Sequence, residues 1–375
     1  MSGLAPLRVV VIAPLRFPIR RPHAGGLESA VWNEVDQLRA RGHDVTLIAA
    51  EGSDWLDERS EFTIPAMTWP GAARPTDDSY PPSYAARSVP ALDRALDRIA
   101  TTAGDYDVIS NHCLHGLPLE RAGDLGVPMI STLHTPVDDA LVASHAAARG
   151  RRSEFLAVSE HTRLQWADAG IESTVLANAV DPLAWPLGPG GPDLVWFGRI
   201  VPEKAPHLAI EVAQRLGRGL VIAGRIGDEL YADRAVLPHV GGAIRYVGQL
   251  SPVELAHLVG RSAALIATPV WEEPFGLVAP EALMTGTPVV SFAMGGVSEI
   301  AAGSVGMVTV PPGDVAALAK RVEHMIVRAS REPGFRPAIR SSAEARFSLP
   351  SRISALERRF RSMLDASESA SEQAA

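Results

Sequence analysis

Several features are scarce or absent in this 375-residue sequence. It contains one cysteine, Cys113, which excludes an internal disulfide framework. Its formal net charge is −8, which argues against broad nucleic-acid binding, although a phosphate pocket needs only a few local cations. No apolar run reaches membrane-spanning length, so we expect no stable membrane insertion. Met1 to Leu7 lacks the charged and apolar regions of a signal peptide, and we predict a cytoplasmic protein.

Signatures of triphosphate and metal binding are also missing. Gly25 and Gly26 precede a predicted helix, but no Lys-Ser/Thr pair follows them as in the phosphate loop of nucleotide triphosphatases. His112, Cys113 and His115 lie close together in sequence, but without a second group of ligands they do not indicate a metal site. We therefore predict neither a bound metal nor a resident cofactor.

The length and the order of the apolar segments predict an α/β protein with two cores. Hydrophobic residues make up 46% of the chain and charged residues 21%, which is ordinary for a globular protein. Short apolar runs alternate with amphipathic segments, first from Leu7 and again from Leu194. Such βαβ order predicts two doubly wound parallel sheets with right-handed crossovers.

The breaker residues divide the chain. Residues 181–192 contain four prolines and three glycines, so we interpret them as a linker. Residues 1–180 would form the first domain and residues 193–348 the second. A helix over residues 349–366 is expected, and residues 367–375, which are small and polar, are expected to be disordered. Residues 53–90 show little periodicity and predict a long irregular excursion.

The most informative segment runs from Glu273 to Glu281, with the sequence EPFGLVAPE. Pro and Gly after the first Glu permit a tight turn, and a short helix is predicted from Leu277 to Met284. The backbone N–H groups of Phe275, Gly276 and Leu277 would then point at one spot and attract an anion. A carboxylate beside a phosphate would repel it, so each Glu is better suited to bind hydroxyl groups. A ligand with hydroxyls at both ends and phosphate between them is a nucleotide sugar.

This segment resembles the E-x7-E signature of retaining glycosyltransferases of family 4, which have the GT-B fold, with two Rossmann-like domains facing across a cleft. The resemblance implies that Glu273 binds hydroxyls of the donor sugar and takes part in catalysis. It also implies that the three loop amides bind the diphosphate and that Glu281 binds the ribose. As lone residues, Glu273 would more often be a helix cap and Glu281 a solvated charge.

Two further segments of the second domain resemble the same family. Arg199 and Lys204 follow the strand at Leu194 to Phe197 and could bring two positive charges to a diphosphate, as in the family's G-R-x-x-x-x-K segment. Lys204 could instead be an exposed residue of a first helical turn, and Ala205 replaces the family's frequent glycine. Gly224 ends the next strand and would let backbone approach the nucleotide.

In the first domain, His134 in the segment STLHTP follows a strand and resembles the family's His-Thr segment, in which the histidine contacts the donor sugar near the reacting carbon. The resemblance makes His134 a catalytic candidate, able to stabilise developing charge. His112 is a candidate for the acceptor side. Gly25 and Gly26 resemble the family's N-terminal glycine pair, which approaches phosphate and acceptor, although glycines in such a loop are often only turn formers.

The resemblance thus implies a retaining, metal-independent hexosyltransferase-type enzyme with a nucleotide-diphosphate sugar as co-substrate. UDP-sugar is favoured on its frequency in the family. A soluble small-molecule acceptor is expected because no polybasic cluster or hydrophobic surface helix is evident. A GT-B phosphorylase, a sugar-nucleotide epimerase and a noncatalytic sugar-nucleotide-binding protein are the alternatives. The oligomeric state and the acceptor's identity do not follow from the sequence.

Overall fold

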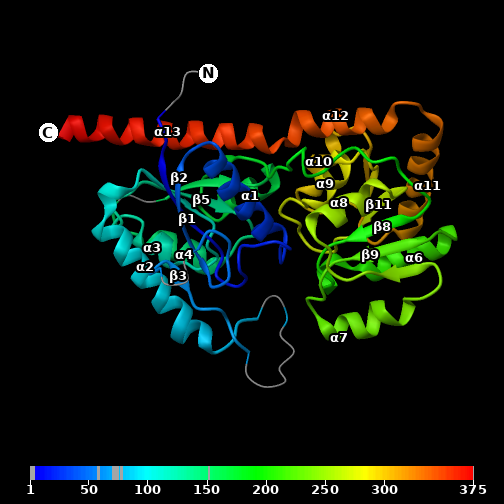
Figure 1. Ribbon diagram of the computed structural model, residues 1–375, viewed down its shortest axis with the longest axis horizontal. Helices are drawn as coiled ribbons and strands as arrows, with labels where there is room; N and C mark the ends of the chain where they lie inside the picture. Colours follow the sequence, from blue (N-terminus) through cyan, green and yellow to red (C-terminus); the bar gives the residue numbers. More distant parts are fainter. Residues whose placement is uncertain (1–4, 57–59, 70–75, 77–78, 151–152, 375) are drawn as a thin grey trace. The chain divides into compact units, whose positions relative to one another are not determined.

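The computed structural model describes residues 5–56, 60–69, 76, 79–150 and 153–374. The chain divides into two compact units, each built around its own parallel sheet (Figure 1). Unit 1 comprises residues 1–71, 80–177 and 350–375, and unit 2 comprises residues 72–79 and 178–349. The chain therefore leaves unit 1 after Ala177 and returns to it at Pro350.

Unit 1 contains a seven-stranded sheet in which every pairing is parallel. In sheet order its strands are β3 (Thr63–Ile64), β2 (Asp44–Ala50), β1 (Arg8–Ile12), β4 (Val108–Asn111), β5 (Met129–Leu133), β6 (Glu154–Ala157) and β7 (Thr174–Val175). Its helices are α1 (Gly26–Ala40), α2 (Val89–Thr101), α3 (Leu117–Arg121), α4 (Asp139–Ala147), α5 (Glu160–Asp168) and α13 (Leu349–Ala374). The reversal of strand order between β1 and β4 creates a switch point, where doubly wound sheets place their ligands.

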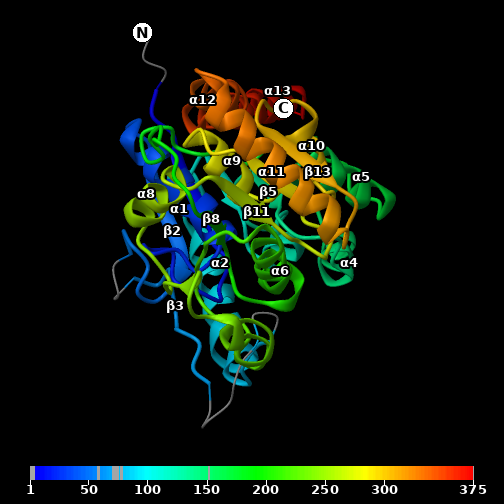
Figure 2. The ribbon, with the colours of Figure 1, turned by 90° about the vertical axis from the view of Figure 1, so that its right-hand side faces the viewer.

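Unit 2 contains a six-stranded parallel sheet with the same reversal. In sheet order its strands are β10 (Ile244–Tyr246), β9 (Leu220–Ala223), β8 (Leu194–Phe197), β11 (Ala264–Ala267), β12 (Val289–Phe292) and β13 (Met307–Val310). Its helices are α6 (Pro206–Leu216), α7 (Glu229–Tyr231), α8 (Pro252–Gly260), α9 (Val278–Met284), α10 (Val297–Ala302), α11 (Val315–Arg331) and α12 (Phe335–Phe347). Helices α8 and α11 lie on opposite sides of strands β8 and β11 in Figure 2.

The central strands of each sheet are buried, and those of unit 2 are largely apolar. All four residues of β8, β9, β11 and β12 are buried. In unit 1, Ile12, Ile48 and Ile109 of neighbouring strands join a core cluster with Leu92 of α2 and Trp166 of α5. Continuous apolar strands covered by helices on both faces are the pattern expected for parallel sheets.

Local sequence signals place several helix starts. Ser251 and Glu254 form a reciprocal capping box at α8, where Pro252 occupies the first turn. Ser159 caps α5 by accepting from the Thr162 N–H at 3.0 Å. Helix α9 begins at Val278 rather than Leu277, because Leu277 is its cap residue.

Two expectations about irregular segments differ from the structure. Helix α13 continues to Ala374, so the disordered tail expected over residues 367–375 is helical through residue 374. Alanine, glutamate and glutamine are good helix formers, and they extend a helix that is already nucleated. The expected excursion over residues 53–90 contains β3, a π-helical turn at Tyr84–Ser88 and the first two residues of α2. Parts of that excursion, residues 57–59, 70–75 and 77–78, lie outside the described residues.

Candidate functional site

In unit 2, the predicted residues Lys204 and Glu273 form an ion pair beyond the carboxyl ends of β8 and β11. Lys204 Nζ contacts Glu273 Oε2, and Trp271 Nε1 donates to the same oxygen at 2.9 Å. Lys204 Nζ also lies 4.8 Å from the centre of the Trp271 ring. Glu273 is only 9% exposed, so a paired cation and an indole N–H are needed to hold its charge there.

Hydrogen bonds from Thr268 fix the backbone at Lys204. Thr268, directly after β11, donates through Oγ1 to the carbonyl oxygens of Lys204 and Ala205, both at 2.9 Å, and accepts from Trp196 Nε1 at 3.2 Å. Ala205 has φ 44°, the left-handed conformation that favours glycine. Arg199 lies nearby in sequence and pairs with Glu203 at 3.4 Å.

The loop after Glu273 is braced by the glycine segment before α10. The Gly296 N–H donates to the Glu273 carbonyl oxygen at 2.8 Å. Gly295 has φ 55°, and a Cβ there would lie 2.3 Å from that same oxygen. Gly276 has φ 90°, so the turn after Pro274 also needs a glycine. In the turn that leads into α9, the Ala279 N–H donates to the Gly276 carbonyl oxygen at 3.1 Å. The amides of Phe275, Gly276 and Leu277, which are the predicted anion-binding groups, lie directly before α9 in the chain.

Glu281 lies one turn into α9 and is partly buried. Burial raises the pKa of its carboxyl to about 8, so the group holds a proton at neutral pH in the ligand-free protein. A carboxyl in this state can donate one hydrogen bond or, once ionised, accept several.

Gly224 has a structural reason to be glycine that does not involve a ligand. Its φ is 142°, and a Cβ there would lie 1.8 Å from the Gly198 carbonyl oxygen. Tyr246 donates through its hydroxyl to the Gly224 carbonyl oxygen at 2.9 Å. The turns after β8 and β9 are therefore packed together, which positions Arg199 at the end of β8.

In unit 1, the predicted residues His112 and His134 are in direct contact. His134 Nε2 lies 2.8 Å from His112 Nδ1, and His112 Nε2 lies 3.0 Å from Glu34 Oε1. His134 follows β5, and the loop after it is fixed by Trp166 Nε1, which donates to the Thr135 carbonyl oxygen at 3.0 Å. Burial and the neighbouring His112 and Arg352 hold the pKa of His134 well below its usual range, so the ring is neutral.

Gly25 and Gly26 stand at the start of α1, where Gly25 is the cap residue with an extended backbone. The Ser29 N–H donates to the Gly25 carbonyl oxygen at 3.1 Å, so the pair forms the turn into α1. This turn follows the end of β1 in the chain, and His112 directly follows β4, the strand beside β1. Cys113 is buried, and burial raises the pKa of its thiol to about 12, which makes it a poor nucleophile.

Four residues of these clusters were not identified from the sequence: Trp271, Thr268, Glu34 and Arg352. For Glu34 a signal exists, because it falls between Val31, Val35 and Leu38 on the apolar face of α1, where a charge requires partners. Trp271, Thr268 and Arg352 become evident only from the tertiary contacts. Within the described residues, His, Cys, Asp and Glu side chains form no group of three that could hold a metal ion.

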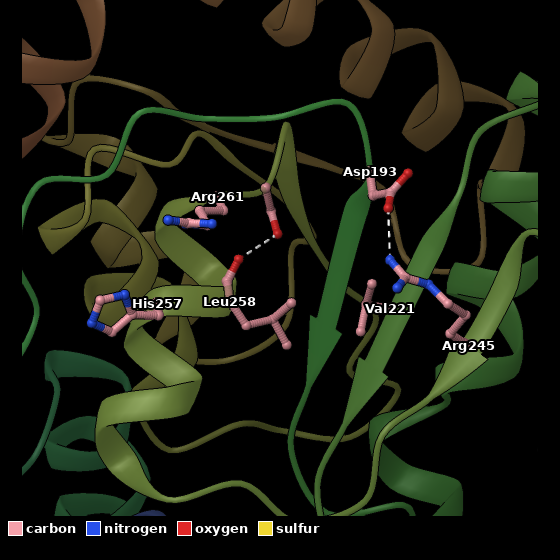
Figure 3. A pocket seen from close by; sticks show the side chains of 7 residues that line it. Asp193, Val221, Arg245, His257, Leu258 and Arg261 are labelled. Atoms are coloured by element: carbon pink, nitrogen blue, oxygen red, sulfur yellow. Dashed lines mark hydrogen bonds and ion pairs between the residues drawn. The ribbon is translucent and has the colours of Figure 1, made fainter.

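A cavity of about 640 Å³ in unit 2 is lined by none of the predicted site residues (Figure 3). Its wall includes Asp193, which precedes β8, and Arg245 of β10; the two are paired at 2.7 Å. It also includes Arg261, which precedes β11. The cavity therefore lies near the amino ends of the strands, whereas Lys204 and Glu273 lie beyond their carboxyl ends, where ligands of doubly wound sheets bind.

Comparison with known protein families gives two matches that together span most of the chain. Residues 24–182 match the model described as Glycosyltransferase Family 4, and residues 184–369 match the model described as Glycosyl transferases group 1. Among the helices of the described residues, none is long and apolar enough to cross a membrane.

Similar proteins include a glycogen synthase of Mycobacterium tuberculosis, 33% identical over 342 residues, with 80% of this chain and 82% of the relative covered. A D-inositol 3-phosphate glycosyltransferase of Gordonia bronchialis is 28% identical over 357 residues, with 80% and 77% covered. Among solved structures, sucrose-phosphate synthase from Thermosynechococcus elongatus aligns with a TM-score of 0.76 at 16% identity, covering 96% of this chain and 100% of that one. Anabaena HepE in complex with UDP and glucose aligns with a TM-score of 0.69 at 15% identity, covering 95% and 100%.

Proposed function

The chain belongs to the glycosyltransferases of group 1 and family 4, with the GT-B fold, and from this membership we propose that it transfers a sugar from a nucleotide-diphosphate sugar to a small soluble acceptor, with retention of anomeric configuration. The observation that carries the proposal is the pairing of Lys204 with Glu273 beyond the carboxyl ends of β8 and β11. It brings a cation suited to a diphosphate beside a carboxylate suited to sugar hydroxyls.

In this proposal, Lys204, Arg199 and the amides of Phe275, Gly276 and Leu277 neutralise the leaving diphosphate. Lys204 turns from Glu273 toward the phosphate, and Glu273 then accepts hydrogen bonds from hydroxyls of the donor sugar. Glu281 accepts from the ribose hydroxyls. The bond between the anomeric carbon and the diphosphate oxygen breaks, while the acceptor oxygen attacks the same face and its proton passes to the departing oxygen. No metal, resident cofactor or separate general base is needed for this scheme.

In unit 1, His134 contacts the donor sugar near the reacting carbon, and Gly25 and Gly26 contribute to the acceptor or phosphate side. His112, expected on the acceptor side, is buried and contributes through its contact with His134. A neutral His134 adds no charge of its own beside the sugar and can exchange one hydrogen bond with a hydroxyl group. A cytoplasmic location, where nucleotide sugars are made available to such enzymes, belongs to the same proposal.

UDP-sugar is the proposed donor, on its frequency in the family, and a solved protein with the same fold was crystallised with UDP and glucose. The names of two relatives refer to two different classes of acceptor. One is named for D-inositol 3-phosphate, a small phosphorylated polyol, and the other for glycogen, a polymer. Because no feature of the sequence indicates a polymer or lipid surface, the small acceptor is the proposal that we favour.

The test is mass-spectrometric detection of sugar transfer with UDP-, GDP- and ADP-sugars against three acceptors: inositol phosphate, malto-oligosaccharides and a pooled extract of small metabolites. Reactions are run with and without chelator, and the anomeric configuration of the product is read by NMR. We expect a chelator-resistant α-linked product from an α-configured UDP-sugar. An inverted product or a chelator-sensitive reaction would contradict the retaining, metal-independent scheme. Release of free sugar phosphate or an epimer would replace transfer by one of the alternative activities.

Lys204→Met tests the role of this lysine in turnover. Lys320, exposed on α11, is the only other lysine of the chain and provides the matched control. Lys320→Met removes the same charge at a surface position. Turnover should fall in the first variant and remain unchanged in the second. Equal turnover in both would remove Lys204 from the donor site.

A further inference from the structure

A buried chain of hydrogen-bonding groups leads from α1 to His134. Ser110 Oγ donates to Glu34 Oε1 at 2.6 Å, and the same oxygen lies 3.0 Å from His112 Nε2. His112 Nδ1 then lies 2.8 Å from His134 Nε2. Glu34 and His112 are each 1% exposed, so neither can contact a substrate directly. Their effect on a ligand must pass through His134.

Glu34 is ionised in this setting. Burial alone would raise the pKa of its carboxyl, but His112, Arg352 and Ser110 outweigh burial and lower the pKa to about 2. Arg352 belongs to α13, and its Nη2 lies 3.8 Å from Glu34 Oε2. Arg352 is itself anchored by Nη1, which donates to the Leu176 and Ala177 carbonyl oxygens at 3.0 and 3.3 Å.

An ionised carboxylate only accepts hydrogen bonds, and this fixes the direction of the chain. Glu34 must receive a proton from His112 Nε2. When both rings are neutral, His112 Nδ1 is then unprotonated and can only accept, so the shared proton belongs to His134 Nε2. The remaining ring nitrogen of His134, Nδ1, is left as an acceptor, and the hydrogen bond of this ring within the described residues is made by Nε2 to His112.

We propose that Glu34 and His112 are positioning residues that hold His134 in its Nε2–H tautomer, so that His134 Nδ1 accepts a hydrogen bond from a hydroxyl of the bound sugar. The role assigned to Nδ1 rests on the proposed function, whereas the tautomer itself does not. The arrangement selects for a hydroxyl donor and against an acceptor at this position. In the opposite tautomer, His134 Nδ1 would carry the proton and would donate a hydrogen bond to the hydroxyl oxygen.

The experiment is ¹⁵N NMR of the full chain labelled at histidine, at pH 8 and without ligand, where the ring nitrogens report the tautomer directly. A His134→Gln variant assigns the His134 signals. We expect the Nε2–H tautomer in the native protein. In Glu34→Gln the amide oxygen should face Arg352 and its NH₂ group His112, so the Nδ1–H tautomer of His134 should become populated. An Nδ1–H native ring, or an unchanged tautomer in Glu34→Gln, would overturn the proposal.

Glu357→Gln is the matched control. Glu357 also joins a histidine and an arginine in unit 1, through His43 Nε2 at 2.7 Å and Arg41 Nη1 at 2.6 Å, but it is not bonded to the His134 chain. Glu357→Gln should leave the His134 signals unchanged. A shift in both variants would point to general loosening of α13 and would overturn the specific role of Glu34.

Turnover supplies the second readout. In Glu34→Gln we expect kcat to fall at least about tenfold with KM little changed, because the ring stays in place while its hydrogen-bonding sense changes. Native kcat in this variant despite a changed tautomer would overturn the positioning role. If the native protein transfers no sugar at all, the proposed function fails, and the NMR result still decides the tautomer.

Discussion

Lys204 and Glu273 neutralise each other in a partly buried setting, and this pair is the point at which a diphosphate would compete. Charge-assisted hydrogen bonds are worth about 1.5–3 kcal/mol, so loss of the ammonium should weaken UDP binding about 10- to 100-fold in Lys204→Met. Isothermal titration calorimetry with UDP measures this, with Lys320→Met as the control. An affinity that is equal in the two variants would show that Lys204 stays with Glu273 when the nucleotide binds.

Glu281 gives a pH-dependent prediction for the same nucleotide. Its carboxyl has a pKa of about 8 in the ligand-free chain, and ribose hydroxyls that donate to it would favour the ionised form and lower that pKa. Binding should therefore release a proton, and affinity should rise from pH 7 to pH 8 and level off above it. Titrations of UDP in buffers of different ionisation enthalpy count the proton.

Glu281→Gln is the control for that titration, because the amide cannot ionise while UDP's own phosphate titration is retained. The slope of affinity against pH should disappear in this variant. If the native protein and Glu281→Gln show the same slope, Glu281 does not ionise on binding and the assigned ribose contact is wrong.

At the scale of elements, the glycine segment before α10 braces the loop that carries Glu273. Gly295→Ala would force a Cβ to within 2.3 Å of the Glu273 carbonyl oxygen at a residue with φ 55°, so the loop must move. We expect kcat/KM to fall at least about tenfold, since small displacements of positioning groups are costly. Gly242→Ala is a close control, because Gly242 has φ 57° and no atom within 4 Å of its Cβ position.

Both glycine variants carry the same backbone strain, about 1 kcal/mol, so their thermal stabilities should fall together unless the clash adds to the cost. The two variants should differ in kcat/KM. Gly242→Ala should keep native kcat/KM, and a loss of activity that is equal in both variants would mean that strain in unit 2, rather than displacement of Glu273, is responsible.

The sequence predicted the elements whose signals are local. Strand β8 has the predicted bounds, Leu194 to Phe197, because its apolar run ends at Gly198. The two-sheet α/β class follows from the alternation of strands and helices. Helix α12 was not predicted: its buried residues Phe335, Ile339, Ala343 and Phe347 do repeat every four positions, but three arginines lie between them. Those arginines include Arg336 and Arg340, which donate to backbone carbonyl oxygens of unit 2.

Some residues of the candidate site were identified from the sequence, whereas their pairings became evident only in the structure. Glu273, Lys204 and His134 were identified because a family motif marks them, and His112 was a separate candidate for the acceptor side. The pairings of Lys204 with Glu273 and of His112 with His134 then appear in the structure. The pairings themselves join residues 69 and 22 positions apart and could not be derived from spacing. Arg352 is the extreme case, since it reaches Glu34 only because the chain returns to unit 1 at its end.

At the scale of the whole molecule, that return makes the C-terminal segment a part of the first core. Phe360 of α13 and Phe292 of β12 are both fully buried, the first in unit 1 and the second in unit 2. Removal of either ring should cost about 3–5 kcal/mol, but in different cores. In Phe360→Ala, hydrogen exchange should accelerate in β1, β4 and β5 while β8, β11 and β12 stay protected.

Phe292→Ala should give the opposite pattern, because local opening follows the cooperative unit in which packing is lost. The two variants remove the same ring from fully buried positions and control for each other. Exchange that accelerates across both sheets in either variant would show that the two units unfold as one, and the assignment of residues 350–375 to an independent first core would then be wrong. Acceleration confined to one sheet in each variant means that a chain end distant in sequence supports the core containing β4 and β5, whose ends carry His112 and His134.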